Sequence, residues 1–401
     1  MKKCISHTLL GILLVSASLG AIADGDFEFS AKVGAELRLF TENAQYSGQQ
    51  GNSNLSTFVE PELFWSWNGG DDTLTFKPFL RLDQNDSERS HGDIRELMWN
   101  HLGDGWELRA GVGKVFWGVT EFQHLVDVIN QSDSVEDVGG ESKLGQPMIN
   151  LSFERDWGIV DLFLLPGFRQ RTYPGIEGRL RSSLVVDTGQ TQYQSSNGDR
   201  HPDIALRWSH TLGDYDIGLH WFHGTNRDPR LDAGTKGATP VLIPYYEQMN
   251  QVGLDLQATL EEWLWKLETR HRDSESSRYW AAHGGFEYTL VGINESSADL
   301  GLLMEYGWDE RGTDPSVIMQ NDLFLGARLA LNDEAGSELL GGIGYDLDYR
   351  SKSLSLEASR RYGDNWKASL DARFYFIDDS SDPVTGYADD SHLKFTLERY
   401  F

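Results

Sequence analysis

The chain ends on SHLKFTLERYF, residues 391–401, in which two kinds of side chain alternate. One set is mostly apolar and consists of Leu393, Phe395, Leu397, Arg399 and Phe401. The other set is polar and consists of His392, Lys394, Thr396, Glu398 and Tyr400. Successive side chains of a β-strand point to opposite faces, so this pattern predicts a strand with one apolar and one polar face. A strand that runs to a terminal exposed Phe is unusual in a soluble protein and is expected of a barrel strand that must close against the first one.

The segment resembles the C-terminal signature of Gram-negative outer-membrane proteins, with one departure. Such strands usually carry an apolar or aromatic residue where Arg399 stands, and Tyr400 lies one place off. The resemblance implies a cell outer-membrane location, contact with membrane lipids and lipopolysaccharide, and recognition by the barrel-assembly machinery through the strand that ends at Phe401.

The other end of the chain predicts export. A basic start at residues 1–3 precedes a short apolar run, residues 9–19, and the small-residue site Ala21-Ile22-Ala23. This pattern is typical of a cleaved secretory signal peptide over residues 1–23, with the mature barrel at 24–401. The apolar run is too short to span a bilayer as a helix. Cys4 is the single cysteine, so the mature chain would hold no disulfide, thiolate metal site or cysteine nucleophile.

Composition narrows the class further. No apolar run after the signal approaches the eighteen or so residues of a transmembrane helix, so membrane insertion would use strands. Removing residues 1–23 takes away two lysines and no acids, which changes the formal net charge from −27 to −29. Such acidity argues against nucleic-acid binding. It fits solubility, adaptation to a salty habitat, or a role in attracting cations.

Period-two alternation recurs along the whole mature chain and predicts an all-β fold. The expected architecture is a transmembrane antiparallel up-and-down β-barrel of about eighteen strands, with sixteen as the alternative count. Every second connection is a tight turn, such as Asn68-Gly69-Gly70-Asp71, and the longest ones lie near 117–147, 169–201 and 224–245. Short turns would face the periplasm and long loops the outside. The expected strands lie near 26–40, 55–67, 72–84, 93–102, 105–116, 147–156, 158–168, 202–212, 214–223, 246–260, 262–273, 279–291, 297–308, 318–331, 337–349, 352–362, 364–377 and 390–401.

Aromatic residues support this topology. Nine of them fall at the predicted periplasmic strand ends, on or next to the outward face, as an interfacial belt would require. They are Trp65, Trp67, Trp106, Tyr215, Trp263, Trp265, Tyr362, Trp366 and Phe401.

The loop after the fifth strand is the first candidate site. An eighteen-strand barrel is too wide for its own side chains to fill, and no plug domain is evident, so a water-filled lumen is expected. Exposure of the apolar stretch 125–129 to solvent would be unfavourable, and burial in the lumen would remove that cost. The loop also carries a set of acids that would lie at a pore constriction: Glu121, Asp127, Asp133, Glu136 and Asp137.

This loop is similar in position to the third extracellular loop of porins, which folds inward and narrows the pore. The resemblance implies a facing basic wall, for which the candidates are Arg38, Arg81, Arg95 and Arg109. Opposed charges across a constriction would order water and favour polar solutes. The alternative is an acidic external loop that bridges divalent ions to lipopolysaccharide.

A second long loop carries the opposite sign. Its arginines are Arg169, Arg171, Arg179 and Arg181, with Pro174-Gly175 marking a turn. They would form a gate with the acids of the preceding loop, contact an anionic solute or lipopolysaccharide phosphates, or simply solvate the loop.

Motifs of the strong enzyme classes are absent from the sequence, including His-Glu-x-x-His, Gly-x-Ser-x-Gly and the phosphate-binding loop. We therefore expect no enzyme, no catalytic residues, no metal site and no cofactor. The predicted function is a porin-like channel for passive diffusion of small hydrophilic solutes or ions, as a monomer or a homotrimer. The alternative is a gated barrel that exports or takes up a polymer or lipid, or a structural barrel that contacts other envelope components.

Overall fold

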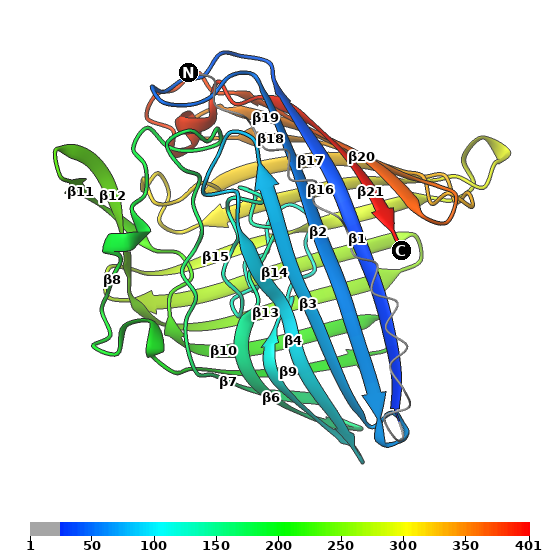
Figure 1. Ribbon diagram of the computed structural model, residues 1–401. Coiled ribbons are helices and arrows are strands. Elements are labelled where there is room, and N and C mark those ends of the chain that lie inside the picture. The colour runs from blue at the N-terminus through cyan, green and yellow to red at the C-terminus, as the bar shows by residue number, and fades with distance from the viewer. Residues whose placement is uncertain (1–24) are drawn as a thin grey trace, which may run out of the picture.

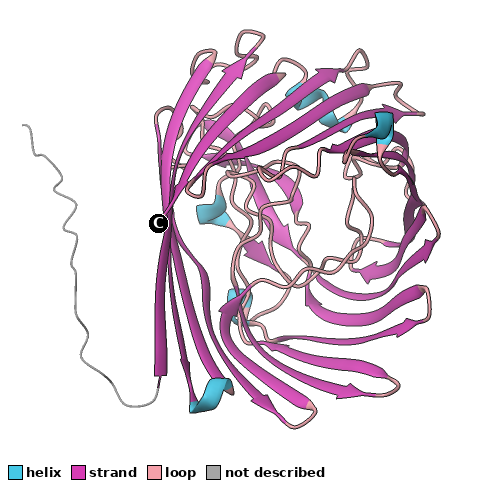
Figure 2. Cartoon of the chain, turned by 90° about the vertical axis from the view of Figure 1, so that its right-hand side faces the viewer, coloured by secondary structure: helices cyan, strands magenta, loops and turns pink. Residues whose placement is uncertain are grey.

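The chain forms one closed antiparallel β-barrel, as a computed structural model that describes residues 25–401 shows (Figures 1 and 2). The predicted signal peptide, residues 1–23, lies outside the described residues. Within the described part, no helix is long and apolar enough to cross a membrane. The eighteen barrel strands confirm the predicted count and are β1 (Gly25–Phe40), β2 (Ser53–Trp67), β3 (Asp72–Asp83), β4 (Gly92–Gly103), β5 (Trp106–Gly113), β6 (Gln146–Arg155), β7 (Gly158–Leu165), β9 (Asp203–Leu212), β10 (Tyr215–Thr225), β13 (Gln248–Leu260), β14 (Trp263–Ser274), β15 (Arg278–Leu290), β16 (Asp299–Asp309), β17 (Asn321–Ala330), β18 (Glu338–Asp346), β19 (Lys352–Tyr362), β20 (Trp366–Phe376) and β21 (His392–Tyr400).

The last strand closes the barrel against the first. β21 pairs with β1 from Lys32 opposite Tyr400 to Phe40 opposite His392. Backbone hydrogen bonds of 3.3 and 3.0 Å between Ala31 and Phe401 extend the ladder to the final residue. Closure leaves no edge strand whose polar backbone would face lipid.

Arg399 has a place on the outer face in spite of its charge. Its guanidinium lies 5.3 Å from the ring centroid of Trp366 and 4.8 Å from that of Phe401. Cation–π contact with two aromatic rings at the strand end offsets part of the cost of a charge near the lipid boundary.

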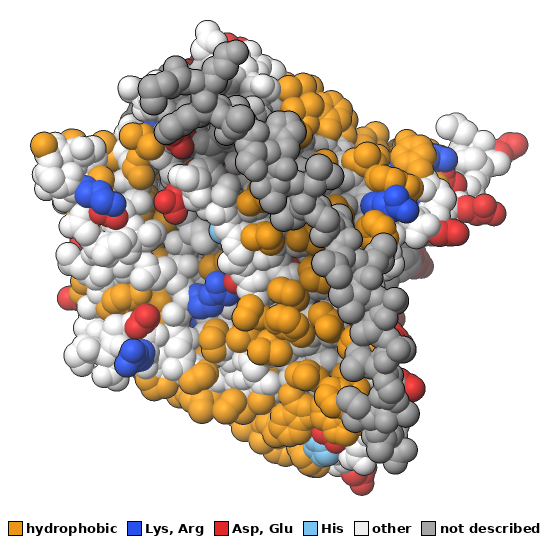
Figure 3. Space-filling model, viewed as in Figure 1, with side chains coloured by type: hydrophobic (Ala, Val, Ile, Leu, Met, Phe, Trp, Pro, Cys, Tyr) orange, Lys and Arg blue, Asp and Glu red, His pale blue; other side chains and the backbone are white. Residues whose placement is uncertain are grey.

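The polarity of the strands is inverted relative to a soluble protein. Along β1, the apolar side chains of Phe27, Phe29 and Val33 are exposed on the outside, whereas Glu36 and Arg38 are buried inside. Figure 3 shows hydrophobic side chains gathered over the outer face of the strands in this region. The outer surface is therefore a lipid-facing band, and the charged residues face the lumen.

One extracellular connection has more structure than the sequence indicated. The loop expected near 224–245 contains a hairpin of β11 (Arg230–Lys236) and β12 (Thr239–Tyr246), joined at Gly237 with a φ of +63°. Strand β8 (Gln192–Tyr193) adds to β12 in parallel. This small sheet stands beyond one end of the barrel (Figure 1). The segment near 224–245 is therefore partly strand, whereas the sequence predicted a loop.

The inverted polarity of the strands predicts that a lysine is tolerated very differently at neighbouring positions of β21. Leu397→Lys should lower the free energy of unfolding by about 2–4 kcal/mol, because the leucine is 47% exposed on the lipid face near the strand centre. Thr396→Lys points into the lumen and should change it by only about 0.5 kcal/mol. Denaturant unfolding in lipid vesicles measures both. Equal losses for the two variants would contradict the assigned faces.

Candidate functional site

The loop between β5 and β6, residues 114–145, folds into the barrel, as predicted. We call it the infolded loop. In the view along the barrel, loops lie inside the ring of strands (Figure 2). The apolar residues of the infolded loop build a buried core with inward side chains of the surrounding strands. The members of this core are Met98, Trp117, Val126, Val128, Ile129, Met148, Phe163, Leu165, Ala205, Phe222 and Met249. The hydrophobic effect thus holds the predicted stretch 125–129 inside the lumen.

Two wall carboxylates, which we call the clamps, fasten the first part of this loop. Glu268 of β14 is fully buried and accepts hydrogen bonds from the backbone N–H groups of Val119 (2.7 Å), Thr120 (3.1 Å) and Val126 (3.2 Å). The Thr120 hydroxyl adds a further bond of 2.7 Å. A buried carboxylate is stable only when its oxygens are satisfied in this way.

Glu305 of β16 is the second clamp. Its oxygens accept from the N–H groups of Glu121 at 2.8 Å and Phe122 at 3.1 Å. Its Oε2 also lies 2.9 Å from the Nε2 of His283, which is fully buried. Phe122 stacks on the ring of Phe324 with centroids 4.9 Å apart. The loop is therefore anchored to this wall by charge and by packing.

The second part of the infolded loop is anchored to the opposite wall by ion pairs. The Arg81 guanidinium of β3 donates two bonds of 2.7 Å to the carboxylate of Glu136. Arg95 of β4 lies 2.6 Å from Asp133, and Arg38 of β1 donates to the backbone carbonyl of Glu136 at 3.0 Å. The structure thus brings two predicted loop acids onto three predicted wall arginines. The fourth, Arg109, contacts Glu107 of its own strand.

The remaining predicted acids have different surroundings. Asp127 is buried 3.1 Å from Lys143 within the loop, and burial raises its pKa. Glu121 lies 2.6 Å from Arg328 of β17 and is 23% exposed. Asp137 forms no ion pair within the described residues and accepts a bond from the N–H of Glu141.

These anchors divide the lumen into two parts. We call the region filled by the infolded loop, along the inner faces of β6 to β15, the dry half. There the inward Asp203, Gln251 and Glu268 are fully buried. The inner faces of β17–β21, β1 and β2 form the wet half, where several inward charged side chains stay accessible, although others, such as Glu36 and Arg38 of β1, are buried. The exposed fractions of the accessible side chains are 28% for Lys32, 35% for Arg328, 47% for Glu357, 33% for Arg373 and 23% for Lys394.

The arginines of the second long loop do not form ion pairs with acids of the infolded loop. Arg169 lies 2.7 Å from Asp93 of β4, and Arg171 lies 2.8 Å from Asp228. Arg179 bonds to Asp390 at 2.5 Å. Arg181 donates only to backbone carbonyls, among them that of Ile176 at 3.1 Å. They tie the long loops to one another and to the rim of the barrel.

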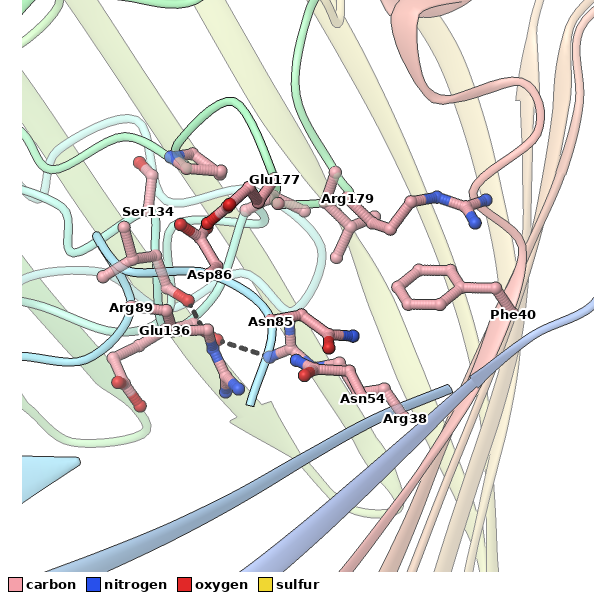
Figure 4. Close-up of a pocket in the computed structure, with 15 residues that line it drawn as sticks. Arg38, Phe40, Asn54, Asn85, Asp86, Arg89, Ser134, Glu136, Glu177 and Arg179 are labelled. Atoms are coloured by element: carbon pink, nitrogen blue, oxygen red, sulfur yellow. Dashed lines mark hydrogen bonds between the residues drawn. The ribbon is translucent and has the colours of Figure 1, made fainter. Parts of the chain in front are cut away.

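A pocket lies between the strand ends of β1 and β2 and three loops, namely the β3–β4 loop, the infolded loop and the second long loop (Figure 4). Arg38, Asn54 and Arg89 line it from below, and Arg179 lies beside the ring of Phe40, 4.3 Å from its centroid. Its enclosed volume is about 20 Å³, which is room for about one water molecule. It is a polar packing gap, too small for a solute.

His124 of the infolded loop completes the anchoring. Burial works against charge on its ring, but Glu141 at 3.5 Å and Glu268 at 3.9 Å outweigh this and raise its pKa to about 10. Sequence reasoning found the loop and missed His124 and the two clamps. Glu268 and Glu305 look like other inward acids of their strands, and no local motif marks them.

Comparisons with known proteins support the fold. No protein-family model and no curated protein matches the chain. Among solved structures, Wzi of Escherichia coli, titled an outer membrane protein involved in group 1 capsule assembly and a carbohydrate-binding β-barrel, is 9% identical over 93% of this chain and 84% of its own, with a TM-score of 0.54. OccD3 (OpdP) of Pseudomonas aeruginosa is 10% identical over 94% and 90%, with a TM-score of 0.51. At these identities the likeness shows the fold alone, a closed antiparallel β-barrel.

The clamps make a testable contribution to loop stability. Glu268→Gln replaces a charged acceptor of four bonds by a neutral amide, which should cost the loop about 1.5–3 kcal/mol. Amide hydrogen exchange of residues 119–126 should become about 10- to 100-fold faster. Glu60→Gln in the wet half is the matched control and should leave this exchange unchanged. Unchanged exchange in Glu268→Gln would contradict the clamp.

His124 gives the anchoring a pH dependence with a defined sign. Its folded pKa, about 10, lies above the ordinary 6.5, so its stabilising charge is fully present below pH 6.5 and is lost as the pH rises through about 10. The wild type should therefore be more stable than His124→Gln at pH 6, and the difference should shrink above pH 10. Unfolding midpoints of both proteins across this range measure it. A difference that grows with pH would refute the assignment.

Proposed function

We propose that this barrel is a channel through which small hydrophilic solutes or ions diffuse passively along the wet half. The observation that carries the proposal is the accessibility of charged side chains that point into the barrel. Arg328, Glu357 and Arg373 are each at least one-third exposed, although they face the lumen. Charged groups at such positions need water, so the lumen beside them is hydrated.

The narrowest part of this path would lie between the infolded loop and the β18–β20 wall. Asp137 is the loop acid on that side and Arg373 the facing wall residue, whereas Glu121 is already paired with Arg328 at 2.6 Å, where the loop contacts β17. Asp137 lies within electrostatic reach of Arg373. Opposite charges on the two sides of the path would produce a transverse field that orders water and favours polar solutes.

We assign different roles to the predicted acids. Asp127, Asp133 and Glu136 are buried in ion pairs, so we assign them to holding the loop. Their burial inside the barrel also leaves them unable to bridge divalent ions to lipopolysaccharide. Asp137 is the acid to which we assign ion selectivity.

A gated barrel is the second candidate, and one observation favours it. Buried ion pairs, such as Arg179 with Asp390 and Arg227 with Asp203, connect the long loops and the rim at one end of the barrel. Such contacts would have to open before a bulky polymer could pass. The two functions differ in their conductance at rest.

Planar-bilayer recording of the refolded chain, residues 24–401, separates them. We expect stable open steps in potassium chloride without any added ligand. A correctly folded, heat-modifiable barrel that stays silent would refute the diffusion channel and favour the gated one.

The selectivity assignment predicts the effect of one substitution. Asp137→Asn should lower the cation-to-anion permeability ratio about twofold, since one charge acts with roughly 0.5 kcal/mol at about 8 Å in water. Asp199→Asn, in an external loop, removes the same charge and should leave the ratio unchanged. Reversal potentials under a salt gradient measure both. An equal shift in the two variants would assign selectivity to overall charge instead.

A further inference from the structure

A group of four arginines, which we call the basic cluster, lies inside the barrel on the long-loop side of the Glu268 clamp. Arg270 and Arg272 follow Glu268 on the same inward face of β14, two and four residues nearer the long loops. Arg171 comes from the second long loop, and Arg311 follows β16. Arg270, Arg272 and Arg311 have no role in the loop anchoring described above, and Arg171 was described there as a partner of Asp228.

Shared partners hold the cluster together. Arg171 and Arg272 bind the two oxygens of one carboxylate, that of Asp228, each at 2.8 Å. The guanidiniums of Arg270 and Arg311 lie over the ring of Tyr279, at 5.6 and 3.7 Å from its centroid. The shared Asp228 carboxylate holds two of the guanidiniums, and the shared Tyr279 ring holds the other two.

Charge in the cluster is not balanced. The carboxylates that pair with it are those of Asp228 and Asp309, the latter 2.7 Å from Arg311. Four positive charges face two negative ones, which leaves a formal charge of +2. Elsewhere in the lumen, Arg81 and Arg95 each have a carboxylate within 3 Å.

Arg270 contributes to this excess of positive charge. Among the described residues it forms no ion pair, and its one hydrogen bond runs from Nη1 to the carbonyl of Leu125 at 3.4 Å. Its Nε is buried without a hydrogen-bond partner. A half-buried guanidinium with an unpartnered Nε beside the like charges of Arg272 and Arg311 is costly, and an anion would relieve that cost.

The cluster is open to solutes. Arg171 is 24% exposed, Arg311 20% and Asp228 54%. Tyr173 and Tyr387 lie within electrostatic reach of Arg171, and Tyr387 is 6.3 Å from Tyr375 of the wet half. The cluster therefore adjoins the mouth of the proposed path.

We propose that the basic cluster is a binding site for the oxyanion group of a small solute, a carboxylate or a phosphate, with Arg270 as its principal ligand. The guanidinium fork of arginine matches both groups in two-point hydrogen bonding. This inference rests on the proposed channel function and names the class of solute that the channel would concentrate at its mouth.

The test is equilibrium binding by isothermal titration calorimetry on the refolded barrel in detergent, with succinate and inorganic phosphate as the probes. We expect at least one of them to bind, and the pair to tell whether carboxylate or phosphate is preferred. Uncharged succinamide should not bind. Arg270→Gln should weaken binding at least about tenfold, and it should fold normally because Arg270 forms no ion pair.

The matched control is Arg361→Gln. Arg361 is also a lumenal arginine without an ion pair, 5.3 Å from the ring of Tyr400 near the short-turn end, and its removal should leave binding unchanged. The inference is overturned if neither anion binds the wild type, or if Arg270→Gln binds as tightly. Calorimetry decides this even for a barrel that conducts no current, so failure of the site and failure of the channel are distinguishable.

Discussion

The width of the barrel is the constraint on which the rest of this structure depends. Closing eighteen strands creates a lumen that their own side chains cannot fill. The infolded loop fills part of it, and the fold of that loop is fixed by groups on two walls. Its apolar stretch packs toward β6–β13, and its carboxylates reach β3 and β4.

The arrangement of charges inside the barrel follows the division of the lumen into a dry half and a wet half. Where the loop packs, charges are buried and each is matched, as in the Glu268 clamp and the pair of Arg81 with Glu136. Where it does not, charged groups keep their water. The basic cluster departs from this rule, because Arg270 is partly buried and forms no ion pair within residues 25–401. That exception is the reason to assign it a ligand.

Much of the fold could be predicted from the sequence, since period-two alternation with an inverted polarity is a local signal. Every expected strand was found to within a few residues, and the burial of residues 125–129 followed from their apolarity. The partners of the loop could not be predicted. Glu268 and Glu305 meet it across more than 140 residues of sequence, and only the register of the closed barrel brings them there. The sequence identified the loop acids, but it did not show which of them would form buried ion pairs.

Single-cysteine labelling tests the central claim most directly, because the chain from residue 24 onward contains no cysteine. Ser369→Cys places a thiol on the inward face of β20 in the wet half, and Ala205→Cys places one in the core of the dry half. A charged methanethiosulfonate reagent should react rapidly with the first thiol and lower the channel conductance. It should leave the second thiol unmodified. Equal reactivity at the two positions would contradict the division of the lumen.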